Sequence, residues 1–128
     1  MNHTSGWLVA LALATFSIGP AFAASASPIG QWEVTTGEAR YVVTSCGAAK
    51  LCAKLVWLRA DARTDENLAV LNHYVVKGAK AQGGGRWLGT LTMSGHSYDG
   101  TMTMVSKNFM TLRGCSGILC QTYEFTRI

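Results

Sequence analysis

The stretch SYDGTMTMV at 97–105 shows the clearest alternation between two kinds of side chain in this sequence. Apolar or small residues occupy every second position and polar residues stand between them: Tyr98, Gly100, Met102 and Met104 against Asp99, Thr101 and Thr103. A repeat of two is that of a β-strand, in which neighbouring side chains point to opposite faces. One face of this stretch is therefore expected to be buried and the other to meet water, which is typical of an antiparallel sheet.

The rest of the chain after Pro28 has the same character. Runs rich in Val, Thr, Tyr, Trp, Leu and Met are separated by short clusters of Gly, Asn and Ser, as in strands joined by tight turns. Short connections pair each strand with the next, and eight short strands in this order close into an up-and-down barrel without exposed edges. The predicted fold is all-β, a small eight-stranded antiparallel barrel with strands at 31–36, 39–46, 51–59, 69–77, 86–93, 97–105, 108–114 and 119–127.

The longest predicted connection, ADARTDENL at 60–68, is the one segment suited to a helical turn, and Thr64 could cap it. The same segment holds the carboxylates of Asp61, Asp65 and Glu66. A calcium-binding loop arranges its oxygen ligands around a Gly, and this segment has none. We therefore expect these carboxylates to be solvated, and no metal site.

The first 23 residues have the pattern of a secretory signal peptide. They contain no Lys, Arg, Asp or Glu, and the apolar run WLVALALATFSI at 7–18 is followed by Ala21-Phe22-Ala23, an A-x-A cleavage pattern. The run is shorter than the roughly 20 residues that a membrane-spanning helix needs. The sequence predicts a signal peptide at 1–23 and one domain at 24–128, periplasmic or secreted, without a transmembrane anchor.

All four cysteines lie in two short stretches, CGAAKLC at 46–52 and CSGILC at 115–120. In an exported chain an even number of cysteines indicates disulfides. A zinc site is disfavoured because no His lies near either stretch in the sequence, and the C-x-x-C motif of redox proteins is absent.

The barrel topology selects one of the three possible pairings. Successive hairpins alternate between the two ends of the barrel, so the turn after the second strand and the turn after the seventh lie at opposite ends. Directly opposed antiparallel residues, with Cα atoms about 4.5 Å apart, are close enough for a disulfide. We therefore predict two hairpin disulfides, Cys46–Cys52 and Cys115–Cys120.

The motifs resemble an uncharacterised bacterial family. Gly30-Gln31-Trp32 at the first strand and Arg127 near the end resemble the lipocalin-type signature, and the order C-G-x-x-x-L-C, T-D-E-N, R-G-C, L-C-x-T and T-R resembles domain-of-unknown-function family 2147. Its members are exported, single-domain and lipocalin-like. The resemblance implies barrel closure by Gly30, Trp32 and Arg127, with the arginine packed across the indole. This chain departs from the family pattern between Thr64 and Gly89, and it has no proline after Pro28.

Charge and motifs narrow the function classes. The formal charge is +4, and the cations are spread from Arg40 to Arg127 without the concentrated stripe of a nucleic-acid-binding protein. Nucleophile-elbow, zinc-protease and phosphate-loop motifs are absent, so we expect neither an enzyme nor a cofactor. His96 falls in a predicted turn, whereas His73 shares a strand face with Leu71 and Val75 and is predicted to point inward.

Two function classes remain. The first is a carrier of a small apolar ligand, which the lipocalin-like resemblance favours. The second is a protein-binding envelope module or enzyme inhibitor that acts through its loops around a solid barrel, because most inward side chains are large and only Gly89 and Gly100 make room. A monomer is expected in both. The inward residues expected to line a cavity are Tyr41, Trp57, His73, Leu91, Met102, Met104, Tyr123 and Phe125.

Overall fold

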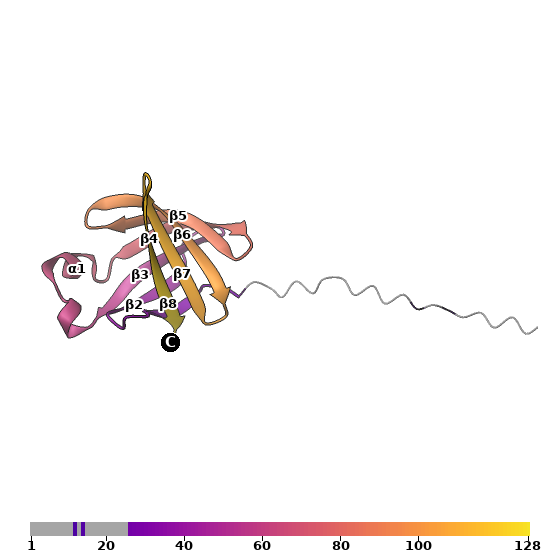
Figure 1. Ribbon diagram of the computed structural model, residues 1–128, viewed down its shortest axis with the longest axis horizontal. Helices are drawn as coiled ribbons and strands as arrows, with labels where there is room; N and C mark the ends of the chain where they lie inside the picture. The colour runs from indigo at the N-terminus through magenta and orange to yellow at the C-terminus, as the bar shows by residue number, and fades with distance from the viewer. Residues whose placement is uncertain (1–11, 13, 15–25) are drawn as a thin grey trace, which may run out of the picture.

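Eight antiparallel strands form a closed barrel in which every strand pairs with its neighbours along the chain (Figure 1). The computed structural model describes residues 26–128 together with Ala12 and Ala14, so the predicted signal peptide lies outside the described residues but for those two. The predicted all-β barrel is confirmed. Its strands are β1 (Gly30–Val34), β2 (Ala39–Ser45), β3 (Lys50–Leu58), β4 (Tyr74–Gly83), β5 (Arg86–Met93), β6 (His96–Ser106), β7 (Phe109–Ser116) and β8 (Leu119–Arg127).

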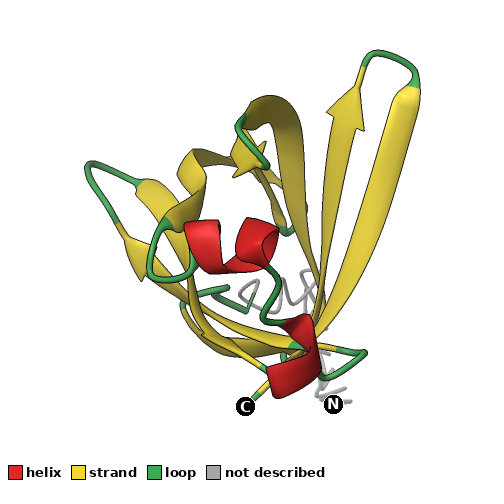
Figure 2. Ribbon diagram, turned by 90° about the vertical axis from the view of Figure 1, so that its left-hand side faces the viewer, coloured by secondary structure: helices red, strands yellow, loops and turns green. Residues whose placement is uncertain are grey.

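The connection between β3 and β4 is helical, as its sequence predicts. It contains a 3-10 turn, η1 (Ala60–Ala62), and a short helix, α1 (Asp65–Val70), which Figure 2 shows in red in front of the strands. The Thr64 hydroxyl accepts a hydrogen bond from the Asn67 backbone N–H at 3.2 Å, so Thr64 caps α1.

The predicted strand at 69–77 is wrong in its first half. The cap at Thr64 starts a helix that continues through Val70, and Asn72 then reverses the chain with φ of 63°. The strand therefore begins at Tyr74 and continues to Gly83, where the positive φ angles of Gly84 and Gly85 make the turn. A local helix cap has outweighed the β-branched and apolar composition of this segment.

A second prediction, the inward direction of Trp57, is wrong because β3 contains a β-bulge. Tyr41 pairs with Leu55 and Arg40 pairs with Trp57, so Val56 is an extra residue that shifts the alternation of β3. Trp57 consequently shares the outer face with Arg40, whose guanidinium lies 4.4 Å from the centre of the indole ring. Trp57 was predicted to point inward, and it points outward.

Both disulfides form as predicted. Cys46 is bonded to Cys52 across the β2–β3 turn, with Cα atoms 5.7 Å apart. Cys115 and Cys120 are opposed residues of β7 and β8, with Cα atoms 4.1 Å apart.

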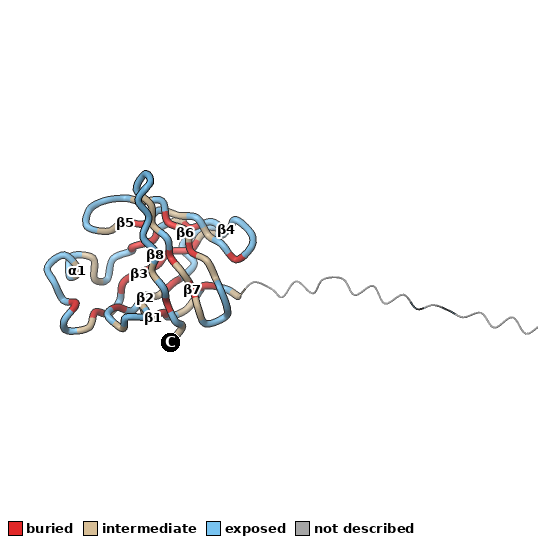
Figure 3. The backbone as a smooth tube through the Cα atoms, viewed as in Figure 1, coloured by how far each residue is buried: buried red, intermediate tan, exposed pale blue. Residues whose placement is uncertain are grey.

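The two ends of the barrel differ. We call the end that holds the β6–β7 turn and the start of β1 the closed end, and the end that holds α1 and the β5–β6 and β7–β8 turns the open end. Buried residues lie mainly within the strands, while the turns are exposed (Figure 3). Among the most deeply buried side chains, each at most 1 % exposed, are Trp32, Val43, Val76, Ala79 and Met102.

Candidate functional site

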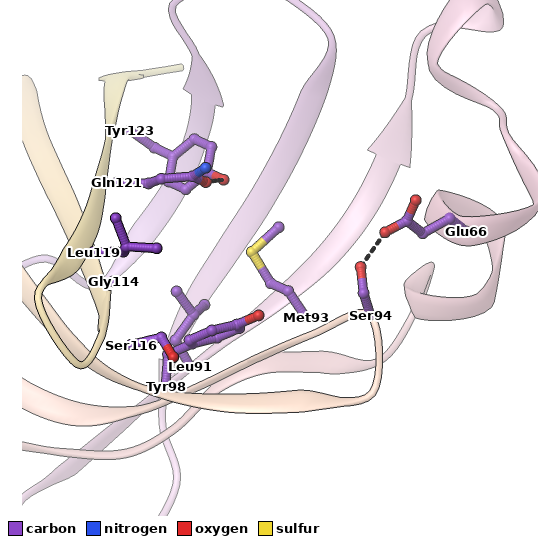
Figure 4. A pocket seen from close by; sticks show the side chains of 10 residues that line it. All are labelled: Glu66, Leu91, Met93, Ser94, Tyr98, Gly114, Ser116, Leu119, Gln121 and Tyr123. Carbon is purple, nitrogen blue, oxygen red and sulfur yellow. Dashed lines mark hydrogen bonds between the residues drawn. The ribbon is translucent and has the colours of Figure 1, made fainter.

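A cavity of about 480 Å³ lies at the open end (Figure 4). Its lining comes from α1, from β5 to β8 and from the β5–β6 turn. In Figure 4, the side chains of Leu119, Gln121 and Tyr123 face those of Met93 and Ser94 across the cavity. The complete lining is Glu66, Leu91, Met93, Ser94, Tyr98, Gly114, Ser116, Leu119, Gln121 and Tyr123.

Exposure of the lining side chains falls from the rim to the interior. The rim residues are exposed, and Leu119 is the extreme at 75 %. Met93, Tyr98 and Tyr123 are half-buried, and Leu91 is only 2 % exposed. The cavity therefore has an accessible mouth and an inner wall that belongs to the hydrophobic core.

A smaller cavity of about 30 Å³ adjoins the inner wall. It shares Leu91, Met93 and Tyr123 with the large cavity and adds Tyr41, Val75 and Phe125. The rings of Tyr41 and Phe125 meet edge to face, with centroids 5.4 Å apart. This smaller space, which we call the floor, is large enough for a methyl-sized group and is almost entirely apolar.

Hydrogen bonds join polar side chains around the cavity. The Tyr123 hydroxyl donates to the Gln121 side-chain oxygen at 2.8 Å. The Ser94 hydroxyl donates to the Glu66 carboxylate, which ties α1 to the β5–β6 turn (Figure 4). Ser94 and Gly95 form the two-residue β5–β6 turn, and both have the positive φ angles that such a turn requires, 52° and 75°.

The hydroxyl of Tyr41 at the floor is strongly perturbed. Burial, and to a lesser degree Tyr123 and Glu38, raises the pKa of Tyr41 to about 12. The phenol is therefore neutral over the physiological range, and it presents a hydrogen-bond donor without a charge.

The expectation that Gly89 and Gly100 make room for a ligand is wrong. A Cβ at Gly89 would lie 2.8 Å from the Ala79 Cα, and one at Gly100 would lie 3.1 Å from the Leu91 Cβ. The missing side chains allow close contacts within the wall, so their space is already filled. Gly114 behaves similarly, because a Cβ there would lie 2.7 Å from Leu91 Cδ2.

The structure gathers four of the eight predicted lining residues at the cavities. Leu91 and Tyr123 line both cavities, and Tyr41 and Phe125 line the floor. Neither of these two cavities is lined by the other four predicted residues: Trp57, His73, Met102 and Met104.

The absence of each of these four residues from the cavity lining has a physical reason. His73 is exposed because the turn that ends α1 includes it, and Trp57 is turned outward by the bulge. Met102 and Met104 are on the inward face of β6, as predicted, but they lie toward the closed end, where they pack in the solid core. Alternation identifies the face of a strand and says nothing about the height of a residue along the barrel.

Sequence reasoning missed several lining residues that share the inward face of a predicted strand. Met93 is two positions from Leu91, and Gln121 is two positions from Tyr123. The period-two signal was sufficient to find both. Glu66, in contrast, reaches the cavity only because α1 lies across the open end, and this placement has no sequence signal.

The predicted closure contact is present at the other end of the barrel. Arg127 pairs with Trp32 across β8 and β1, and its guanidinium lies 4.4 Å from the centre of the indole ring. It donates to the backbone carbonyls of Ser27, Ile29 and Lys107 at 2.7–3.0 Å. Gly30 has a φ of 140°, a backbone conformation that favours glycine, and a Cβ there would also lie 2.5 Å from Arg127 Nη1.

Two further observations concern membrane-spanning helices and groups that could bind a metal ion. Within residues 26–128, Ala12 and Ala14, no helix has the length and apolar character needed to cross a membrane. The same described residues contain no group of three or more His, Cys, Asp or Glu side chains that could hold a metal ion.

Comparisons with known proteins identify the family of the chain. No curated protein matches the chain, and no solved structure matches it. One family model matches, that of the uncharacterised proteins conserved in bacteria designated DUF2147, over residues 30–127. The match spans the whole barrel from β1 to β8, and the chain belongs to this family.

Proposed function

We propose that this protein is an exported, non-catalytic carrier that binds one small, predominantly apolar ligand in the cavity at its open end. The observation that carries the proposal is the cavity itself: about 480 Å³, open at the rim and adjoining the largely apolar floor, with which it shares Leu91, Met93 and Tyr123. This volume falls within the range of small-molecule sites. The inner wall supplies the apolar contact area that drives binding of such a ligand.

Other features support export and a non-catalytic role. Two disulfides are typical of proteins that fold in an oxidising compartment, and the leader pattern at 1–23 agrees with this. Both histidines of the barrel, His73 and His96, are exposed and outside the cavity lining. The lining holds one carboxylate, that of Glu66, and its hydroxyl and amide groups, such as those of Tyr98 and Gln121, can orient a ligand by hydrogen bonds.

A neutral fluorescent probe tests the proposal. N-phenyl-1-naphthylamine, which fluoresces in apolar surroundings, should bind the mature protein at one saturable site at micromolar concentration. Met93→Ala should weaken this binding about three- to tenfold, because a buried methylene contributes about 0.8 kcal/mol and Met93 is half-buried in the lining.

Met104→Ala is the matched control. Met104 is also half-buried but packs against the core outside the cavity, so its loss should lower stability and leave the affinity for the probe within about twofold. Absence of saturable binding, or equal weakening by both variants, would contradict the proposal.

A second candidate function is supported by the tip of the β7–β8 hairpin. Ile118 is 99 % exposed and Leu119 is 75 % exposed, an unusual position for two large apolar side chains. They would suit a loop-mediated contact with an envelope protein. Native mass spectrometry of protein isolated from its own host distinguishes the two, because a carrier retains a small mass and a protein-binding module retains a polypeptide.

A further inference from the structure

Polar and apolar groups are segregated along the depth of the cavity. The exposed rim carries Ser94, Ser116 and Gln121 as well as Leu119, whereas Leu91 and the floor are apolar apart from the hydroxyls of Tyr41 and Tyr123. The polar groups of the rim can hydrogen-bond to a polar headgroup, and the inner wall offers its contact area to an apolar tail. The lining therefore fits an amphipathic ligand whose tail points inward.

The charge at the rim is of one sign. Glu66 is the only Asp, Glu, Lys, Arg or His among the ten lining residues, and Figure 4 shows its carboxylate at the mouth, held by Ser94. A ligand headgroup that reaches the rim therefore meets a negative charge and neutral hydrogen-bonding groups.

No cation of the β3–β4 connection is placed to receive an acid headgroup. Arg59 is bound by the Asp61 carboxylate, with Nε–Oδ1 and Nη2–Oδ2 distances of 2.6 and 2.9 Å, and lies 4.0 Å from Glu38. Arg63 donates to the Leu58 carbonyl. Neither arginine lines the cavity.

From this arrangement we infer that the ligand is a neutral or cationic amphiphile, an apolar chain or ring with a hydroxyl or amino headgroup, and that carboxylic acids are discriminated against. The inference rests on the proposed carrier function. The tail fills the inner wall and floor, and the headgroup lies beside Glu66 and the polar rim. Glu66 is thus a specificity-determining residue.

Three ligands of equal chain length test the inference. Decylamine, decanol and decanoate are cationic, neutral and anionic at neutral pH, and each is titrated against the bound neutral naphthylamine probe at low ionic strength. Decylamine should bind roughly fivefold more tightly than decanoate, because an exposed carboxylate attracts one headgroup and repels the other modestly. Added salt should reduce this ratio.

Two variants assign the preference to one carboxylate. Glu66→Gln should bring the three ligands to nearly equal affinity. Asp65→Asn removes the same charge from the adjacent residue of α1, which does not line the cavity, and should retain most of the preference.

The outcomes separate this inference from the carrier proposal. If decanoate binds as tightly as decylamine, or if Glu66→Gln leaves the preference intact, the inference is wrong and the carrier proposal stands. If neither the probe nor any of the three ligands binds, both are wrong. An equal effect of Asp65→Asn and Glu66→Gln would also overturn the assignment to Glu66.

Discussion

Arg127 shows how one side chain can close the barrel. It covers the indole of Trp32 and donates hydrogen bonds to three backbone carbonyls that precede β1 or lie in the β6–β7 turn. The Trp32 indole N–H in turn donates to the Pro28 carbonyl at 2.8 Å. The first and last strands are therefore joined by side-chain contacts as well as by their ladder of backbone hydrogen bonds.

Removal of this contact should be measurable. Arg127→Ala should lower the free energy of unfolding by about 1–2 kcal/mol and shift tryptophan fluorescence to longer wavelength, because the indole loses its cation and its cover. Arg113→Ala, at an exposed position of β7, is the control and should change stability by less than about 0.5 kcal/mol. A similarly small change in stability for Arg127→Ala would show that Arg127 behaves as an ordinary surface charge.

The raised pKa of Tyr41 predicts a loss of stability at alkaline pH. In the unfolded chain this tyrosine loses its proton near pH 10, whereas the folded protein retains it until about pH 12. The unfolded state then binds fewer protons, so the free energy of unfolding falls as pH rises through this window. The contribution of Tyr41 is fully present below pH 10.

Tyr41→Phe isolates this effect. Denaturant unfolding at a series of pH values should show a decline between pH 10 and 12 that is smaller in Tyr41→Phe than in the wild type, by roughly 2–3 kcal/mol over the window. Identical declines in the two proteins would show that the phenol is solvated.

At the scale of elements, the two disulfides brace opposite ends of the barrel. The Cys115–Cys120 bridge stabilises the β7–β8 hairpin, which supplies Ser116, Leu119 and Gln121 to the cavity. The Cys46–Cys52 bridge lies at the β2–β3 turn, and the residues it encloses line neither the large cavity nor the floor. Both close short loops, so each should stabilise the fold by about 2 kcal/mol.

Pairwise serine replacement distinguishes their roles. Loss of either disulfide should lower the free energy of unfolding by a similar amount, roughly 2 kcal/mol. Only the Cys115→Ser/Cys120→Ser protein should also bind the neutral probe several-fold more weakly, because its hairpin can move away from the mouth. Unchanged binding in that protein, or equal weakening in both, would show that the hairpin does not shape the site.

The elements also show where sequence patterns succeed. Period-two alternation identified the inward faces of β5, β6 and β8, and with them Leu91 and Tyr123. It failed at Trp57, because the extra residue of a bulge has no composition signal, and at His73, because a capped helix replaced the start of a strand. Alternation predicts the direction of a side chain only as long as the strand keeps its pairing register.

At the scale of the whole molecule, the barrel combines a solid closed end with a hollow open end. Trp32 and Met102 fill the first, and the second is lined at its rim by residues of α1, of the β5–β6 turn and of the ends of β7 and β8. The sequence predicted the barrel and its disulfides, since these follow from strand order and spacing, and the family resemblance implied the closure contact between Trp32 and Arg127. It could not predict the cavity, because that depends on where along the barrel the side chains lie and on the placement of α1.

The most direct test of the carrier account is an NMR titration of protein labelled with ¹³C in its methionine methyl groups. Met93 lines the cavity, whereas Met102 and Met110 are buried in the core outside it. Addition of decanol should shift the Met93 methyl signal to saturation, with transfer of magnetisation from the ligand chain to that methyl group, and should leave the Met102 and Met110 signals in place. A Met93 signal that does not move at saturating ligand, or a uniform shift of all the methyl signals, would contradict the account.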